Sequence, residues 1–513
     1  MSKLFSRQFL LGATALLLYL ALAKLLLHLW FSSGYGYFRD EFYYLACGEH
    51  LDWGYVDQPP LTPLLAFLTR QFLGESLVAL RFLPAVAGAL LVLVTGLMVR
   101  ELGGGRFAQG LAAVSVIAGP VYLGIDHIFT VNAFDHLFWA LGAYLVILIV
   151  KRGDPRLWLV FGLVAGVGLQ NKLSMLFFGF GVVVGLLLTP HRKYILSKWL
   201  WLGGLIAFVI FLPYFLWQFQ HDWPMLELLR RGQLYKNYPL SPLQFLWGQV
   251  LEIHPFNLPI WLAGLYFYLV SKPGKPYRLL GWTYVPILIV FFVLKAKTYY
   301  LAPAYPMLLA AGALVIETFI RERQWNWLKP ATVGLLLAGG AITAPFAMPV
   351  LPVETYIKYQ SFLGIEPPKT ERHKFGKLPQ GYADMFGWEN MAATVAKVYN
   401  SLSPEERAKC AIFTSNYGEA GAIDFFGKKY GLPKAISGHN NYWLWGPGNH
   451  TGEIVITVGE SLEDVEKTFA QVELGATHVH EYAMPYESDL PVYICRKPKV
   501  SLPEVWPRVK GYM

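Results

Sequence analysis

The sequence predicts a mainly α-helical, polytopic membrane protein with a C-terminal soluble α/β domain. Of the 513 residues, 55% are hydrophobic and only 15% are charged, whereas an average soluble domain has roughly 25% charged residues. Apolar runs of about 17 to 25 residues, long enough to cross a bilayer, recur over residues 1–350. Beyond residue 350 these runs stop, and short helix and strand patterns alternate instead.

The apolar runs predict about eleven transmembrane helices. The first run follows Lys3 and Arg7, a pattern that also describes a signal peptide. Its apolar stretch exceeds the roughly 7–15 residues of a signal peptide, so we expect a membrane anchor. The predicted spans are 8–30, 82–99, 107–124, 133–150, 157–170, 173–189, 200–218, 256–270, 279–294, 302–318 and 330–348.

Basic residues follow every second predicted span, which sets the expected orientation. Loops on the cytoplasmic side of membrane proteins carry an excess of Lys and Arg. The pattern predicts a cytoplasmic N-terminus and an extracytoplasmic C-terminal domain in the inner (plasma) membrane. The net charge of +9 then reflects these loops and the bilayer, and we expect no nucleic-acid partner. The basic loop residues are Arg100, Arg106, Lys151, Arg152, Arg156, Arg192, Lys193, Lys198, Lys272, Lys275, Arg278, Arg321, Arg323 and Lys329.

The segment 351–513 is predicted to be the soluble domain, following a membrane domain over 1–350. Cys410 and Cys495 both fall in predicted strands, where they form either a disulfide in an oxidising compartment or two buried thiols. The predicted helices are 388–400, 418–430 and 461–474, and the predicted strands are 410–415, 434–437, 453–458 and 492–496.

The first outer loop carries the densest group of candidate site residues. Asp40 and Glu41 are adjacent carboxylates among aromatic residues just beyond the first span. Such a pair suits proton abstraction or metal binding, because an apolar setting raises the proton affinity of a carboxylate. A solvated acid pair beside interfacial aromatic residues is the alternative. Asp57 and Gln58 follow in the same loop, before Pro59-Pro60, and we expect them to contact the substrate.

The second outer loop adds Asp126 and His127 as candidate substrate-binding residues. Asp135 lies at the start of the fourth span, where the helix dipole favours an anionic carboxylate. A simple N-terminal cap by Asn132 or Asp135 is the alternative for that position.

Cationic and phenolic side chains form a third candidate group. Lys297, Tyr299 and Tyr300 lie between the ninth and tenth spans, on the side where basic residues are otherwise scarce. Lys172 lies on the same predicted side. Such residues suit an anionic phosphate headgroup, and lysines that extend along the membrane to reach water are the alternative.

Together these features resemble the family 39 glycosyltransferases, a group that includes protein O-mannosyltransferases and the aminoarabinose transferases of lipid A. The resemblance lies in the Arg39-Asp40-Glu41 context, the loop ending in Pro59-Pro60, Asp135 at the start of a span and the 297–306 stretch. It covers roughly residues 1–350 and implies the GT-C membrane fold. The C-terminal stretches 381–388 and 415–423 look like those of uncharacterised bacterial members of the family.

The resemblance implies transfer of a hexosyl or pentosyl group from a polyprenyl-phosphate-linked donor to a cell-envelope acceptor on the outer face. Asp40 would be the general base, with Glu41 beside it and Asp135 as a second acid that shapes the site. The donor phosphate would be held by Lys172, Lys297 and Tyr299. Aminoarabinose transferases have a lysine where this chain has Gln58, which puts lipid A in doubt as the acceptor.

Other functions compete with glycosyl transfer. A flippase or transporter of a lipid-linked saccharide would share the basic loops. Transporters, however, favour internal repeats and mid-span polar residues, whereas the charged residues here cluster at one face and no repeat is seen. A membrane-anchored binding protein would not need about eleven spans. We assign no cofactor to the sequence. Two adjacent acids could bind a divalent cation, but the histidines are not at metal-ligand spacing.

Overall fold

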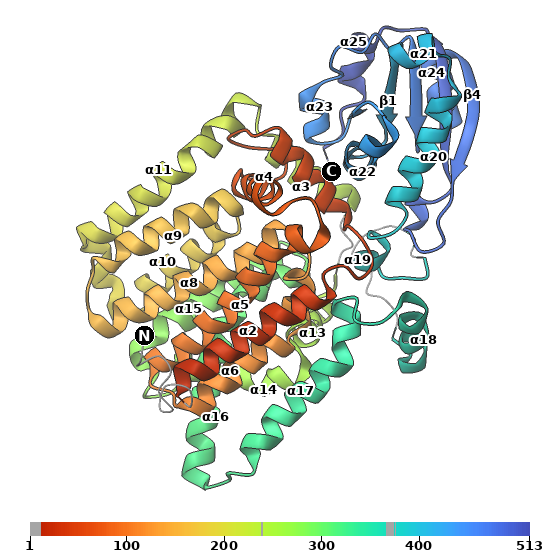
Figure 1. The fold of residues 1–513 in the computed structure, drawn as a ribbon. Coiled ribbons are helices and arrows are strands. Elements are labelled where there is room, and N and C mark those ends of the chain that lie inside the picture. Colours follow the sequence, from red (N-terminus) through yellow and green to blue (C-terminus); the bar gives the residue numbers. More distant parts are fainter. Residues whose placement is uncertain (1–11, 237–239, 366–373, 375, 513) are drawn as a thin grey trace.

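The computed structural model describes residues 12–236, 240–365, 374 and 376–512. Lys3, Arg7 and the start of the 8–30 span lie outside these described residues. Figure 1 shows a helical bundle followed by an α/β domain, coloured blue, which sits at one end of the bundle. The predicted fold class, a multi-span helical protein with a C-terminal α/β domain, is confirmed.

Helices account for every predicted span within the described residues. In chain order the bundle contains α2 (Ala13–Phe31), α3 (Arg39–Glu49), α4 (Leu61–Leu73), α5 (Leu77–Leu102), α6 (Arg106–Ala118), α7 (Pro120–Ile125), α8 (Val131–Arg152), α9 (Leu157–Asn171), α10 (Met175–Leu187), α11 (Lys198–Gln220), α12 (Pro224–Arg231), α13 (Pro242–Ile253), α14 (Leu258–Leu269), α15 (Arg278–Val293), the 3₁₀ helix η5 (Thr298–Ala304), α16 (Tyr305–Arg323) and α17 (Leu328–Ala347).

Fewer described helices meet the length and hydropathy of a membrane span than the roughly eleven predicted spans, so the exact span count stays a prediction. Seven described helices are long and apolar enough to cross a membrane, or up to eight if one bent pair, α10 with η1 (Pro190–Leu196), forms a single span. Several predicted spans are shorter helices, and the 107–124 range is divided between α6 and α7. The break falls where Pro120 starts a new helix, because proline lacks the N–H that would continue the preceding one.

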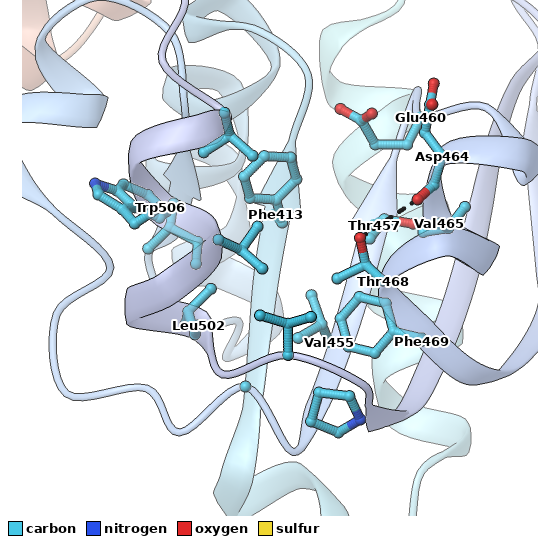
Figure 2. A pocket seen from close by; sticks show the side chains of 16 residues that line it. Phe413, Val455, Thr457, Glu460, Asp464, Val465, Thr468, Phe469, Leu502 and Trp506 are labelled. Carbon is cyan, nitrogen blue, oxygen red and sulfur yellow. Dashed lines mark hydrogen bonds between the residues drawn. The ribbon is translucent and has the colours of Figure 1, made fainter.

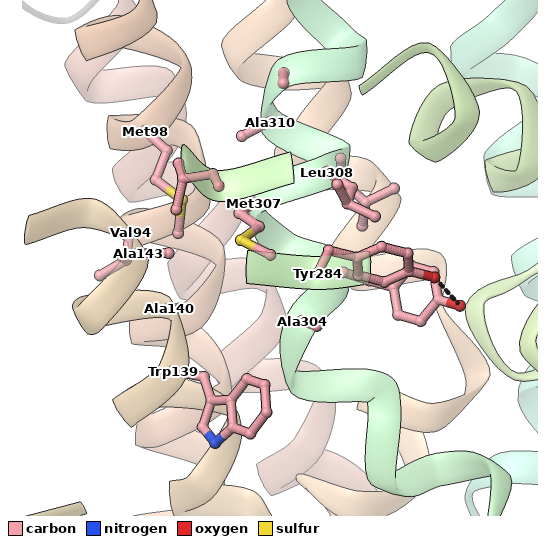
Figure 3. Close-up of a cluster of buried hydrophobic side chains, with 14 of the residues drawn as sticks. Val94, Met98, Trp139, Ala140, Ala143, Tyr284, Ala304, Met307, Leu308 and Ala310 are labelled. Carbon is pink, nitrogen blue, oxygen red and sulfur yellow. Dashed lines mark hydrogen bonds between the residues drawn. The ribbon is translucent and has the colours of Figure 1, made fainter. Parts of the chain in front are cut away.

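The bundle core lies where α5, α8 and α16 pack together. Met98, Trp139 and Met307 are fully buried there. Figure 3 shows that the surrounding positions include several alanines: Ala140, Ala143, Ala304 and Ala310. Small residues let membrane helices approach closely, which favours association because lipid supplies no hydrophobic drive between helices. The loops at the ends of the bundle are therefore held by closely packed helices.

The C-terminal domain contains a five-stranded sheet in the order β2-β1-β3-β5-β4. Strand β1 runs parallel to β2 and β3, whereas β5 is antiparallel to β3 and β4. The elements are α18 (Val353–Leu363), α19 (Gln380–Ala383), α20 (Trp388–Ser401), α21 (Pro404–Lys409), β1 (Cys410–Thr414), α22 (Tyr417–Phe426), β2 (Ala435–Ser437), α23 (Asn441–Trp445), β3 (Ile454–Val458), α24 (Leu462–Thr468), β4 (Phe469–His478), β5 (Leu490–Pro498) and α25 (Leu502–Val505).

The predicted helix 461–474 is wrong in its second half. Helix α24 ends at Thr468, and the chain continues as β4, in which Gln471 pairs with Arg496 and Glu473 with Ile494. Pairing with β5 overrides the local helix pattern, since strand formation depends on the neighbours available in the fold.

The two strand cysteines do not form a disulfide. Cys410 lies on β1 and Cys495 on β5, with β3 between them. Two strand spacings amount to about 10 Å, beyond the Cα–Cα distance that a disulfide allows. Both residues are buried free thiols.

Helix α3 belongs to both parts of the molecule. It packs against α4 of the bundle and against α22 of the C-terminal domain, and Figure 1 shows α3 and α22 side by side. Phe42, Tyr43 and Cys47 share one buried apolar cluster with Trp388 and Ile423 of the C-terminal domain. The C-terminal domain is therefore seated on α3 by a common core.

Candidate active site

Asp40 lies in the first turn of α3, where the helix dipole stabilises a carboxylate. Its Oδ1 accepts a hydrogen bond of 2.8 Å from the hydroxyl of Tyr417, which belongs to the C-terminal domain. The side chain is half-buried, and no ion pair to it occurs among the described residues. Asp40 is thus a partly accessible carboxylate at the junction of the two parts.

Glu41, the next residue, has a different environment. Arg81 forms a two-pronged ion pair with it, with both N–H···O distances at 2.8 Å. The backbone N–H groups of Phe38 and Phe129 also donate to Glu41, at 2.8 and 2.9 Å. Each oxygen therefore accepts two hydrogen bonds in a fully buried side chain. This arrangement holds the start of α3, and a direct catalytic part for Glu41 stays a prediction.

Asp57 lies on the other side of the same loop, close to Tyr43. The Tyr43 hydroxyl is 3.0 Å from Asp57 Oδ1 and 3.0 Å from Asn441 Oδ1 of the C-terminal domain. Burial raises the pKa of Tyr44 well above its usual value, and the nearby charges of Asp40 and Asp57 raise it further. Both carboxylates therefore act on the same tyrosine.

Gln58 is buried and contacts Cys47 of α3. Its Nε2 lies 3.9 Å from the Cys47 sulfur. Its neighbour Asp57 is half-exposed, so only one of these two predicted substrate-binding residues is accessible.

Lys172, just after α9, is the centre of a second polar group, which we call the Lys172 cluster: Asn132, Asp135, Lys172, Ser174 and Tyr300. Lys172 Nζ donates to Asn132 Oδ1 at 2.6 Å and lies 3.6 Å from Asp135 Oδ2. Ser174 donates to the other Asp135 oxygen at 2.6 Å. The ammonium also lies 4.7 Å from the centre of the Tyr300 ring, and its side chain is 21% exposed. A cation held this way is oriented but not fully neutralised.

The other predicted phosphate residues adjoin this cluster through η5. The Tyr299 and Tyr300 rings are in edge contact, with centroids 4.8 Å apart. Lys297 is the residue that precedes η5, and it is half-buried. The structure thus brings Asp135, Lys172 and Tyr300 into direct contact and places Tyr299 beside them.

A hydrogen-bonded link connects the first loop to the Lys172 cluster. Thr62, two residues after Pro60, donates to Asn171 Oδ1 at 2.9 Å. Asn171 in turn donates to the carbonyl of Val131 at 2.8 Å. The first loop, the start of α8 and the end of α9 therefore meet at the end of the bundle that carries α3.

Asp126 and His127 lie elsewhere, in the interior of the bundle. Both are fully buried; Asp126 Oδ2 is 2.9 Å from Lys24 Nζ, and His127 Nε2 is 3.4 Å from Arg81 Nη1. Gly88 makes room for this arrangement, because a Cβ there would lie 2.5 Å from Asp126 Oδ2. Both residues were predicted to lie in an outer loop, and the structure instead buries them directly after α7. Their part in substrate binding stays a prediction.

Among the described residues, no group of three or more His, Cys, Asp or Glu side chains is placed to hold a metal ion. A separate apolar pocket of about 140 Å³ lies in the C-terminal domain. Figure 2 shows Phe413, Val455, Phe469 and Trp506 around it, with Glu460 at one end. None of the predicted site residues lines this pocket.

Tyr417, Asn441 and Arg81 were not predicted as site residues. Arg81 had a readable signal, because a charged residue at the edge of an apolar span is rarely without a role. Tyr417 lies in the 415–423 stretch that resembles family members, but no local pattern connects it or Asn441 to the first loop, since each is more than 350 positions from its partner there.

Comparison with known proteins places this geometry in a known fold. Residues 57–217 match the profile of a family described as dolichyl-phosphate-mannose-protein mannosyltransferase. No curated protein matches the chain by sequence. The crystal structure of ArnT from Cupriavidus metallidurans bound to undecaprenyl phosphate is similar, with a TM-score of 0.61 and 13% identity over 93% of this chain and 97% of that one.

A second solved structure supports the same architecture. The oligosaccharyltransferase of Archaeoglobus fulgidus in the apo form has a TM-score of 0.50 and 12% identity, over 84% of this chain and 65% of that one. At such identities the likeness concerns the fold. The chain is therefore a multi-pass membrane protein with the GT-C glycosyltransferase fold, similar to family 39 and, over residues 57–217, to the dolichyl-phosphate-mannose-protein mannosyltransferases.

Proposed function

We propose that the protein transfers a sugar from a polyprenyl-phosphate-linked donor to a cell-envelope acceptor, with Asp40 as the general base. A fold hosts many functions, so the proposal depends on the site. The observation that carries it is the contrast between two neighbouring acids: Arg81 neutralises Glu41, whereas Asp40 stays partly accessible without an ion-pair partner among the described residues. The undecaprenyl phosphate bound to the structurally similar ArnT supports a lipid-phosphate donor.

At the base end of the site, Asp40 accepts the proton of the acceptor hydroxyl. The hydroxyl oxygen forms a bond to the anomeric carbon of the sugar as the bond from that carbon to the phosphate oxygen breaks. Polyprenyl phosphate leaves with the electron pair. General-base catalysis of this kind contributes about 10²- to 10⁴-fold to a rate.

At the phosphate end, Lys172 and Lys297 offset the negative charge that grows on the leaving phosphate, with Tyr299 and Tyr300 as hydrogen-bond donors. Asp135 and Asn132 orient the Lys172 ammonium from one side. Its remaining hydrogens are then available to the phosphate, because an ammonium carries three donors.

We also propose that the protein lies in the inner (plasma) membrane with a cytoplasmic N-terminus and an extracytoplasmic C-terminal domain. Asn400 is exposed, and all three native cysteines are buried, so an Asn400→Cys variant gives one reactive thiol. We expect an impermeant maleimide to label it in intact cells with a permeabilised outer membrane. Protection until the inner membrane is opened would reverse the orientation.

The activity is tested with membranes that contain or lack the protein. Radiolabelled polyprenyl-phosphate sugars are added, and the envelope component that acquires label is identified. We expect Asp40→Asn to abolish labelling while expression and donor binding are retained. Asp154→Asn, which alters a partly exposed acid paired with Arg156, serves as the matched control. Full transfer by Asp40→Asn removes Asp40 as the base, and lipid translocation without transfer identifies a flippase.

A further inference from the structure

Helix α22 of the C-terminal domain lies in unusually close contact with α3. A Cβ at Gly421 would lie 2.8 Å from Cβ of Phe42, and a Cβ at Gly418 would lie 2.7 Å from Cγ of Arg39. Both distances are shorter than packing allows, so glycine is needed at both positions. The two helices are therefore held at a fixed separation by their backbones.

This contact sets the position of Tyr417 at the start of α22. Asn416 caps the helix, since its Oδ1 accepts from the N–H groups of Gly418 and Glu419 at 2.9 and 3.1 Å. The Tyr417 ring packs 4.7 Å from Tyr43 and is only 8% exposed. Its hydroxyl has little freedom and meets Asp40 Oδ1 at 2.8 Å.

Arg39 of α3 also contacts the C-terminal domain. The guanidinium lies 4.9 Å from the centre of the Tyr417 ring, 3.3 Å from the Tyr486 hydroxyl and 3.7 Å from Glu487. All three partners belong to the C-terminal domain. Arg39 and Asp40, adjacent in sequence, are thus both held by side chains of the other part.

The Tyr417 hydroxyl acts as a donor at ordinary pH. Burial raises the pKa of the Tyr417 phenol well above its usual value, and the Asp40 charge raises it further, while Arg39 opposes the shift. The phenol therefore keeps its proton. The hydrogen bond from this phenol holds one oxygen of the Asp40 carboxylate in place.

We infer that Tyr417 is a positioning residue for Asp40, so the C-terminal domain completes the active site. This role rests on the proposed function of Asp40 as general base. With Oδ1 held by Tyr417, the carboxylate presents Oδ2 to the acceptor hydroxyl in one orientation. A base must lie within hydrogen-bond reach of the proton it removes, so loss of this orientation lowers turnover.

The test compares two tyrosine variants of the full-length protein in membranes. Tyr417→Phe removes only the hydroxyl that reaches Asp40. We expect kcat to fall about 10- to 100-fold, the effect of losing a hydrogen bond to a charged group. We expect the apparent KM for the radiolabelled donor to stay constant, so that the loss is in kcat alone.

Tyr442→Phe is the matched control, because it also removes a tyrosine–aspartate bond in the same domain, the 2.9 Å contact with Asp424. Its kcat and donor KM should equal those of the parent protein. An unchanged kcat per folded molecule in Tyr417→Phe, or an equal loss of kcat in Tyr442→Phe, overturns the inference. Full transfer by Asp40→Asn would instead overturn the proposed function itself.

Discussion

Two groups of charged residues in the membrane half differ in their exposure to water. In the interior, Arg81 pairs with Glu41 and Lys24 with Asp126, and these side chains are at most 2% exposed. At the end that carries α3, Asp40 and Lys172 stay partly exposed. A charged side chain in an apolar setting is costly, so it is either paired in the interior or functional. The exposure of the side chain to solvent distinguishes these two cases.

The largest loss of stability is expected from a change in the interior of the bundle. Asp126→Asn leaves the Lys24 charge buried without its partner, which costs about 3–5 kcal/mol of unfolding free energy. Thermal unfolding in detergent measures this loss. Donor affinity per folded molecule should be unchanged. A fully stable Asp126→Asn protein with weakened donor binding would return Asp126 to the substrate site.

A smaller effect is expected where the two parts meet. Gly421→Val forces a side chain against Phe42, and overpacking of this kind costs about 1–3 kcal/mol. We expect sugar transfer to fall as α22 moves away from α3, and hydrogen exchange of α3 to rise. Gly381→Ala is the control, because a Cβ at that position meets no atom within 4 Å. Normal transfer by Gly421→Val would show that the close contact is dispensable.

At the phosphate end, removal of a positive charge is expected to weaken donor binding without loss of stability. Lys297→Ala is expected to raise the donor KM about tenfold, equivalent to about 1.4 kcal/mol, with little change in kcat. Kinetics at varied donor concentration separate the two parameters. Lys295→Ala, which alters an exposed lysine two positions earlier, provides the control. Unchanged donor affinity in Lys297→Ala would remove Lys297 from the phosphate site.

The smallest effect concerns ion pairs across the junction. Burial acts to raise the pKa of Glu49. Arg70 of α4 and Lys434 of the C-terminal domain outweigh this effect and lower the pKa to about 2. Because the folded pKa is below the ordinary value of 4.5, the stabilisation is present above pH 4.5 and is lost as the pH falls towards 2.

Partial exposure limits this contribution to about 1 kcal/mol or less. Glu49→Gln should therefore lower the unfolding temperature slightly at pH 6, and the difference from the parent protein should vanish near pH 2–3. A constant difference across this range would contradict the ion-pair role.

Local patterns predicted much of the fold. The helices 388–400 and 418–430 and the four strands correspond to observed elements within a few residues, since their apolar spacing and caps are local properties. The β4 strand was missed because its partner β5 lies further along the chain. The predicted span 107–124 is divided between α6 and α7, because hydropathy does not show where one helix ends and the next begins.

Hydropathy and charge belong to each residue whatever its neighbours, so they were enough to predict the membrane class, the C-terminal α/β domain and the residue types of the candidate site. Which of the two acids is accessible depends on packing. Asp40 and Glu41 are adjacent, yet a helix turns neighbouring side chains about 100° apart. Glu41 consequently faces Arg81 inside the bundle, while Asp40 faces Tyr417, a residue brought to it by the packing of a distant domain.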